Sequence, residues 1–219
     1  MAGAGPALQG LVDQRTQWVQ RIHAELYHHG VAVPEGAIRS AKTQALLADP
    51  GLRISGAARQ RIATGYRMIE ATDTEAQPLK RQLTRFGERQ PGCRALVAGH
   101  YGIGGLIAVA VWSELGDCRR FTRSLQVVRH TGLDVTVDAS DRRRANGFLS
   151  RQGPELLRWA LYEAAKNSSH ERSPDHDYYA AVKKTHDGKI AAISMARKLA
   201  RRCYHTLRSV DPDLIYAVP

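Results

Sequence analysis

Apolar side chains recur along two segments of this chain at helical spacing, and this repeat constrains the fold more than any other feature. Over residues 57–86 the steps are three, four and seven, which predicts one long helix with a coiled-coil-like seam. Asp73 stands on the seam and Pro78 lies inside it, so we expect a kink or a discontinuity there. Residues 8–29 predict a second helix with one apolar stripe. Two such helices pair either in an antiparallel hairpin or with another copy of the chain.

The long pattern stops near residues 86–92, where we place a domain boundary. Residues 1–90 form a helical, coiled-coil-like connector, and residues 91–219 form a C-terminal domain of short helices and turns. Helices are predicted at 104–116, 121–130, 154–168, 177–184 and 188–209. Around residues 133–150, apolar and polar side chains alternate and an Arg-rich stretch with Asn-Gly follows, which predicts a short β-hairpin or an ordered loop. The predicted fold class is therefore mainly α.

The charge balance indicates a polyanionic partner. The 219 residues hold 32 Lys+Arg against 21 Asp+Glu, a formal net charge of +11, and nucleic acid is the commonest partner of such chains. An acidic membrane surface is the alternative, but the sequence has no amphipathic anchor or lipidation site. The longest apolar stretch, residues 96–112, is shorter than a membrane span requires. We expect a cytoplasmic protein that contacts DNA or RNA and no membrane.

A glycine-containing turn is the first candidate contact to nucleic acid. Gly102-Ile103-Gly104, followed by Ala108, fits a helix–hairpin–helix pattern. Glycines let such a turn approach a phosphate, and the following helix offers free N–H groups at its N-terminus. These contacts touch the backbone and carry no base specificity. The alternative is a helix–turn–helix packing unit whose glycines permit close approach within the protein.

Ser140, followed by arginines, is the candidate nucleophile. A serine hydroxyl needs a base, and an attacked phosphodiester needs its charge neutralised. Guanidinium groups grip phosphate in a bidentate manner, and the candidate clamps are Arg142, Arg143, Arg144, Arg151 and Arg158. The alternative is that Ser140 is a solvated loop residue or a helix cap.

The segment 188–209 predicts a helix with an apolar side that runs from Ile190 to Leu207. Basic residues, including Arg197 and Arg201, lie around the rest of it. They form either a solvated face around a core helix or a phosphate-contacting face. No His, Cys or carboxylate pattern indicates a metal site, although Asp175-His176-Asp177 has the residue types for one.

Several motifs occur in an order that resembles one family. The sequence shows GIGGLIAVAVWSELGD, then CRRF, TGLDVTVDAS, SRQGPELLRWALYEAA and ARKLARRCYHTLR. Together they resemble the C-terminal module of the one-ten type of insertion-sequence transposases, a family of RNA-guided serine recombinases. The resemblance covers roughly residues 93–210, and the preceding helices are similar to the coiled-coil connector of that family.

The resemblance implies a mechanism and a set of partners. The family's nucleophilic serine falls on Ser140, eight positions after Gly132, and it would attack a DNA phosphodiester to give a covalent phosphoserine link. DNA, a guide (bridge) RNA and further copies of the chain, joined through the connector helices, are the implied partners. Family members usually have Pro soon after Gly-Leu and Gly directly after the serine, whereas this chain has Asp134-Val135 and Asp141.

Full-length members begin with a RuvC-like domain whose four acidic residues hold divalent metal. Nothing in this sequence matches that domain, so we expect no cofactor on this chain and Mg²⁺ only through the missing domain. We predict that this polypeptide alone binds nucleic acid and does not recombine it. Two other functions are compatible with the sequence: a non-catalytic helix–hairpin–helix module that binds DNA or RNA, and a coiled-coil dimerisation protein.

Overall fold

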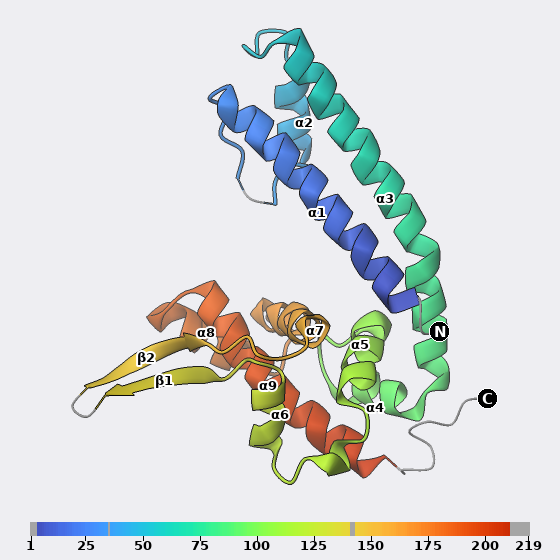
Figure 1. Cartoon of the computed structure of the whole chain (residues 1–219), viewed down its shortest axis with the longest axis vertical. Helices are drawn as coiled ribbons and strands as arrows, with labels where there is room; N and C mark the ends of the chain where they lie inside the picture. Colours follow the sequence, from blue (N-terminus) through green and yellow to red (C-terminus); the bar gives the residue numbers. More distant parts are fainter. Residues whose placement is uncertain (1–3, 35, 141–142, 211–219) are drawn as a thin grey trace. The chain divides into compact units, whose positions relative to one another are not determined.

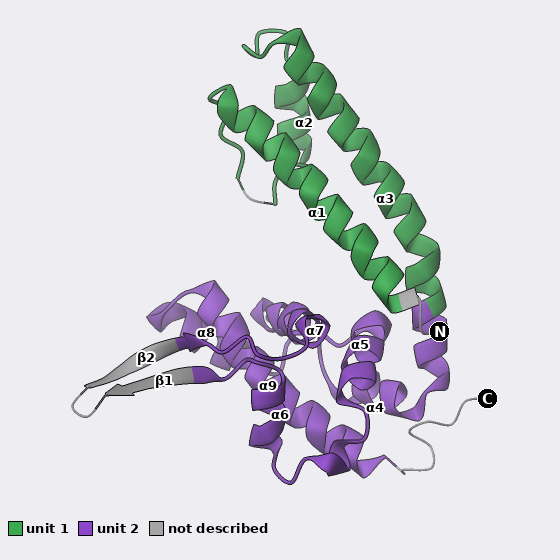
Figure 2. Ribbon diagram, viewed as in Figure 1, with its two compact units in different colours: residues 1–82 green, residues 83–219 purple. Residues whose placement is uncertain are grey.

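A computed structural model describes the backbone of residues 4–34, 36–140 and 143–210, and the side chains of these residues except 4 and 136–147. The chain divides into two compact units, residues 1–82 and 83–219 (Figure 2). The division falls inside the third helix, at Gln82, rather than at the end of that helix near residue 90. Among the described residues, no helix is both long and apolar enough to cross a membrane.

Unit 1 is built from α1 (Ala4–His28), α2 (Ala41–Ala48) and most of α3 (Gly56–Arg89) (Figure 1). Its core consists of isoleucine and leucine side chains from α1, α3 and the connecting segment: Ile22, Leu26, Ile38, Ile62 and Ile69. The sequence predicted both long helices. It did not predict α2, whose eight residues are too few to show a helical repeat.

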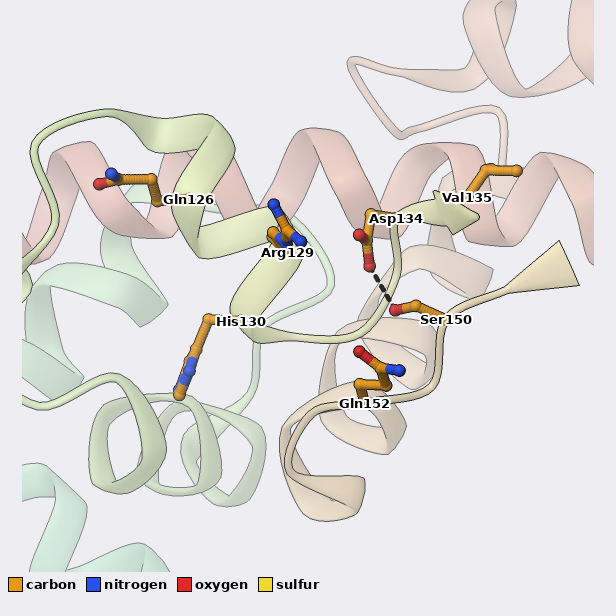
Figure 3. Close-up of a pocket in the computed structure, with 7 residues that line it drawn as sticks. All are labelled: Gln126, Arg129, His130, Asp134, Val135, Ser150 and Gln152. Carbon is orange, nitrogen blue, oxygen red and sulfur yellow. Dashed lines mark hydrogen bonds between the residues drawn. The ribbon is translucent and has the colours of Figure 1, made fainter. Parts of the chain in front are cut away.

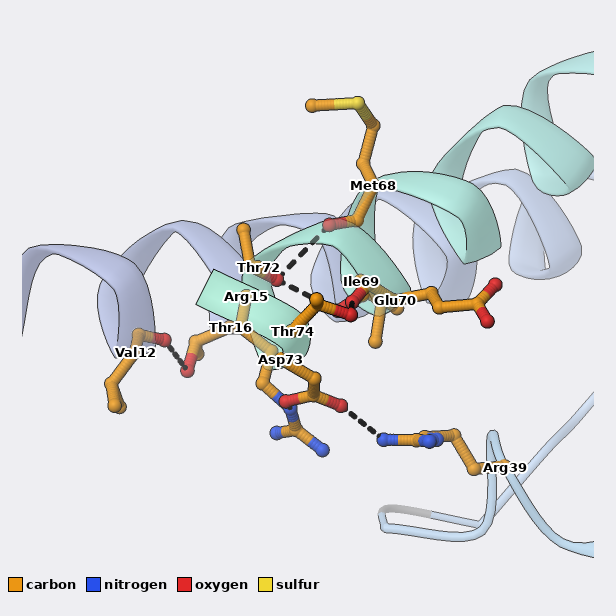
Figure 4. Close-up of polar contacts among 10 residues, drawn as sticks. All are labelled: Val12, Arg15, Thr16, Arg39, Met68, Ile69, Glu70, Thr72, Asp73 and Thr74. Atoms are coloured by element: carbon orange, nitrogen blue, oxygen red, sulfur yellow. Dashed lines mark hydrogen bonds and ion pairs between the residues drawn. The ribbon is translucent and has the colours of Figure 1, made fainter. Parts of the chain in front are cut away.

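The contacts between α1 and α3 show that the two helices pair antiparallel. A Cβ atom on Gly65 would lie 2.7 Å from Cγ1 of Ile22, so this glycine lets the helices approach closely. Further along, Arg15 Nε lies 2.9 Å from the carboxylate of Asp73, which also pairs with Arg39 (Figure 4). The charged residue on the predicted seam is therefore neutralised by two arginines of unit 1.

The predicted discontinuity at Pro78 was wrong. One continuous helix runs from Gly56 to Arg89, with Pro78 inside it. A proline costs a helix interior about 3 kcal/mol or more, but Ala76 before it and Leu83 after it are both buried. Burial on both sides stabilises the helical backbone across the proline.

Unit 2 holds the end of α3, six further α-helices and two short 3₁₀ turns among its described residues. They are α4 (Pro91–Gly99), α5 (Gly105–Leu115), η1 (Cys118–Arg120), α6 (Ser124–His130), α7 (Glu155–Lys166), η2 (Asn167–Ser169), α8 (His176–Thr185) and α9 (Gly188–Ser209). The sequence predicted α5 to α9 to within a few residues and missed α4. The prediction of a mainly α fold is confirmed.

The central element of unit 2 is α9, which packs against α4, α5, α6, α7 and α8 (Figure 1). Its buried face is rich in alanine, which lets neighbouring helices approach closely: Ala191, Ala192, Met195, Ala196, Leu199, Ala200, Cys203, Tyr204 and Leu207. The predicted apolar side was partly wrong, since Ile190 is 45% exposed. Ile190 instead lines a cleft with Tyr178 and Val182 of α8, whereas Ala191 and Ala192 beside it are buried.

Two antiparallel strands project from this helical body. β1 (Val135–Ser140) pairs with β2 (Arg143–Leu149), with Val135 opposite Leu149 and Ser140 opposite Arg143. The register shifts between Val135 and Val137. Of the two predicted alternatives, the hairpin is the one that the structure contains.

Candidate nucleic-acid interface

The β-hairpin joins the helices of unit 2 through a narrow neck, which we define as residues 132–134 and 150–153. The two sides of the neck are hydrogen-bonded to each other. Ser150 N donates to the carbonyl of Asp134 at 2.9 Å, and Arg151 N donates to that of Gly132 at 3.0 Å. The Ser150 hydroxyl also donates to the Asp134 carboxylate (Figure 3). Backbone and side-chain bonds therefore both close the base of the hairpin.

Two glycines allow the chain to cross itself at the neck. A Cβ atom on Gly153 would lie 2.2 Å from the carbonyl oxygen of His130, and one on Gly132 would lie 2.8 Å from the backbone nitrogen of Gln152. Gly132 also has a φ of +68°, which glycine adopts without steric cost. Any side chain at these positions would force the two backbone segments apart.

Two arginines from different helices bind the backbone of the neck. Arg197 of α9 donates from Nε to the carbonyl of Leu133 at 2.5 Å. Arg158 of α7 donates from Nη1 to the carbonyl of Arg151 at 3.2 Å and also to that of Gly153. Both arginines were predicted to contact nucleic acid, and here their guanidinium groups bind the chain's own carbonyls.

A polar cleft of about 640 Å³ lies beside the neck (Figure 3). It is lined by Gln126, Arg129, His130, Asp134, Val135, Ser150 and Gln152. The Arg129 side chain is exposed and makes no hydrogen bond or ion pair with any residue that the structure describes. An unpaired guanidinium beside a polar cleft suits the binding of a phosphate group.

The predicted nucleophile lies at the far end of the hairpin. Ser140 is the last residue of β1, and its partner Arg143 begins β2, with Arg144 next to it. The side chains of these three residues, and Arg142 altogether, lie outside the described residues. Their predicted roles therefore stay predictions. What the structure adds is the backbone position: the serine is the sixth and last residue of β1, counted from the neck.

The predicted helix–hairpin–helix turn joins α4 to α5. Gly102 has a φ of +85°, and a Cβ atom there would lie 2.5 Å from the carbonyl oxygen of Ala164 in α7. Gly104 is the exposed N-cap of α5, and nothing lies within 4 Å of a Cβ built on it. Gly102 thus serves packing within the chain, whereas Gly104 leaves room for another molecule at the α5 N-terminus.

Basic residues on α9 are mostly bound within unit 2. Asp175, the buried N-cap residue of α8, accepts hydrogen bonds from Arg202 and Lys198. The bonds from Arg202 hold the pKa of the Asp175 carboxyl below its usual range, against the opposing effect of burial. Arg201, a predicted phosphate contact, donates to the Ser124 hydroxyl at 3.3 Å. Much of the predicted basic face therefore links α9 to its neighbours.

Comparisons with known proteins find matches to transposases. The model of the Transposase IS116/IS110/IS902 family matches residues 94–180. The chain is also 24% identical over 157 residues to the transposase for insertion sequence element IS1111A of Coxiella burnetii (strain RSA 493 / Nine Mile phase I). Together the two matches support an IS110-type insertion-sequence transposase. The alignment covers 71% of this chain and 43% of that relative, so the chain spans less than half the length of the curated relative it matches.

The region matched by the family model runs from α4 into α8 and includes both strands of the hairpin. The resemblance inferred from the sequence is thereby confirmed at the level of the family. Sequence reasoning missed the pair formed by Asp134 and Ser150. A signal was present, since the two polar residues flank the predicted strands, but only the closed hairpin brings them within hydrogen-bond distance.

Proposed function

We propose that this chain is the DNA-handling part of an insertion-sequence transposase and that Ser140 is its nucleophile. The observation that carries the proposal is the family match, which includes the hairpin with Ser140 at the end of β1. A hairpin that projects from the helices can bring a hydroxyl to a DNA backbone. The excess of 32 Lys+Arg over 21 Asp+Glu supports DNA as the partner.

The proposed step exchanges one phosphate ester for another. The Ser140 oxygen forms a bond to the DNA phosphorus, and the bond from phosphorus to a deoxyribose oxygen breaks. The serine hydroxyl loses its proton, and the released deoxyribose oxygen takes up a proton in exchange. The phosphoserine ester keeps the bond energy for rejoining. Arg142, Arg143 and Arg144 would neutralise the phosphate and offset the neighbouring carboxylate of Asp141.

The described residues offer no donor set for a divalent cation. No three His, Cys, Asp or Glu side chains gather there as a metal site needs. No step is therefore assigned to a metal on this part of the chain. The same proposal includes three partners that rest on the family resemblance alone. They are a RuvC-like domain that holds Mg²⁺, a guide RNA, and further copies of the chain.

A trapped covalent adduct tests this function. The chain is mixed with DNA that carries the ends of the insertion sequence. A full-length family member, whose own nucleophilic serine has been replaced by alanine, is added to the mixture. Denaturation should then leave labelled DNA on this chain. Ser140→Ala should abolish the adduct while DNA binding changes by less than about twofold, because one neutral hydroxyl contributes little to phosphate affinity.

Ser150→Ala is the comparison variant: its hydroxyl is bound to Asp134 at the neck, so its removal should slow the adduct but not abolish it. An adduct that survives Ser140→Ala and disappears in Ser150→Ala would move the nucleophile to the neck. Salt-sensitive DNA binding with no adduct from the unaltered chain would favour the non-catalytic binding module instead.

A further inference from the structure

The hairpin acts as a lever whose direction is set at the neck. β1 runs for six residues, from Val135 to Ser140. At about 3.3 Å per residue, Ser140 lies about 17 Å beyond Val135, so a tilt of about 3° at the neck moves it by about 1 Å. A misplacement of about 1 Å can slow a reaction about 100-fold. Accurate placement of Ser140 therefore needs a neck that resists small rotations.

The two neck arginines provide such a restraint from separate helices. Arg197 of α9 binds the segment that enters the hairpin, at Leu133. Arg158 of α7 binds the segment that leaves it, at Arg151 and Gly153. A single attachment would leave the hairpin free to turn about that point, whereas two attachments on two packed helices restrain both tilt and twist.

The chemistry of these contacts explains why arginine stands at both positions. A guanidinium presents its donors in a rigid, planar arrangement, whereas a lysine ammonium is a single point on a flexible stem. Both arginines are half-buried, and their donors are directed at backbone carbonyls. Hydrogen bonds from a charged donor are stronger than those from a neutral one, so they help to hold the two-stranded hairpin in one direction.

We propose that Arg158 and Arg197 are positioning residues that fix the direction of the β-hairpin and so place Ser140 against its target phosphate. The effect on catalysis rests on the proposed function of Ser140. The effect on the hairpin does not, because it depends only on the neck contacts. The two effects are therefore measured separately.

Arg158→Lys and Arg197→Lys test the effect on the hairpin, because each keeps the charge and removes the rigid donor geometry. Arg208→Lys is the matched control, since Arg208 also lies on α9 and donates to a carbonyl, that of Phe121 at 3.0 Å. Hydrogen exchange of the neck amides of Ser150 and Arg151 should speed up about 10-fold or more in both neck variants. It should stay unchanged in the control.

Spin labels on cysteines introduced at positions 145 and 171 measure the direction of the hairpin independently. The native cysteines are buried and should stay unlabelled. Each neck variant should broaden or shift the distance distribution. The salt dependence of DNA binding should stay unchanged, since the charge is kept. Unchanged exchange and distances in both neck variants would overturn the proposal. A slope of log K against log salt reduced by about 0.9 in the charge-removing variants Arg158→Gln and Arg197→Gln would make the arginines phosphate contacts.

The adduct assay measures the effect on catalysis. Each neck variant should form the Ser140 adduct about 10- to 100-fold more slowly at unchanged DNA affinity. A loosened neck with a normal adduct rate would refute positioning of the nucleophile. Persistence of the adduct in Ser140→Ala would refute the nucleophile while leaving the restraint of the hairpin intact.

Discussion

The ion pairs of Asp175 allow the sharpest prediction about stability. Asp175 is the N-cap residue of α8, its side chain is 8% exposed, and it accepts hydrogen bonds from Arg202 and Lys198 of α9. Arg202 Nη2 lies 2.9 Å from Asp175 Oδ1, and Lys198 Nζ lies 3.3 Å from the same oxygen. Replacing Asp175 with Asn keeps the shape and removes the charge, so the variant isolates the ionic part of the contact between α8 and α9.

We expect Asp175→Asn to lower the free energy of unfolding by about 2 kcal/mol at pH 7, within the usual range for hydrogen bonds to charged groups. The loss stays below the value of about 3–5 kcal/mol for a fully buried pair, because Arg202 and Lys198 are 43% and 36% exposed and regain contact with water. The corresponding fall in Tm is about 4–8 °C.

The effect should depend on pH in one direction. The hydrogen bonds from Arg202 lower the pKa of Asp175 in the folded chain. The stabilisation is therefore fully present above the unfolded pKa, near 3.9, and is lost as the pH falls through the folded pKa. Urea unfolding followed by circular dichroism should show the full difference between the unaltered chain and Asp175→Asn at pH 7 and a smaller one at pH 3.

Asp177→Asn is the control, since Asp177 is exposed in the first turn of α8. It should cost less than about 1 kcal/mol, the usual contribution of a charge near a helix end. An equal loss from Asp175→Asn at both pH values, or no loss at pH 7, would refute the ionic account.

Three further predictions follow from close packing. Gly153→Ala should destabilise the chain by about 3 kcal/mol or more in a urea titration, because its Cβ would meet a carbonyl oxygen at 2.2 Å. Gly104→Ala has open space around it and should change the free energy of unfolding by less than about 0.5 kcal/mol. Gly65→Ala should lower the free energy of unfolding by about 1–3 kcal/mol through overpacking. Gly10 is exposed in α1, so Gly10→Ala should raise the free energy of unfolding by about 0.5–1 kcal/mol. Thermal unfolding in which Gly65→Ala is the less destabilising of the two would contradict this packing. Burial raises the pKa values of the three cysteine thiols to about 11 or 12. A thiol reagent at pH 8 should therefore modify them only when urea has unfolded the chain. Rapid labelling of the folded chain would contradict their burial.

Much of the fold was predictable because most of its helices carry their own signals. The limits of α9, residues 188–209, and of α3 followed from apolar periodicity with little error. The short helices α2 and α4 were missed, although Pro91 stands at the N-terminus of α4 as prolines often do. The buried face of α9 was misjudged at Ile190, because this side chain lines a cleft beside α8 while Ala191 and Ala192 are buried.

The candidate site was less predictable, since its contacts join residues distant in sequence. Arg197 and Leu133 are 64 positions apart, and Asp175 and Arg202 are 27 apart. The sequence indicated correctly that arginine is abundant beside the hairpin. It did not indicate which guanidinium groups bind carbonyls or carboxylates of the chain and which, such as Arg129, face a cleft without a partner among the described residues.

The most direct test of the central claim is to locate the phosphorylated residue. After the adduct reaction, nuclease and protease digestion leaves a nucleotide remnant on one peptide, which fragmentation mass spectrometry assigns to a single side chain. The account predicts the remnant on Ser140, at the end of β1. A remnant on Ser150 or on any other residue would contradict it.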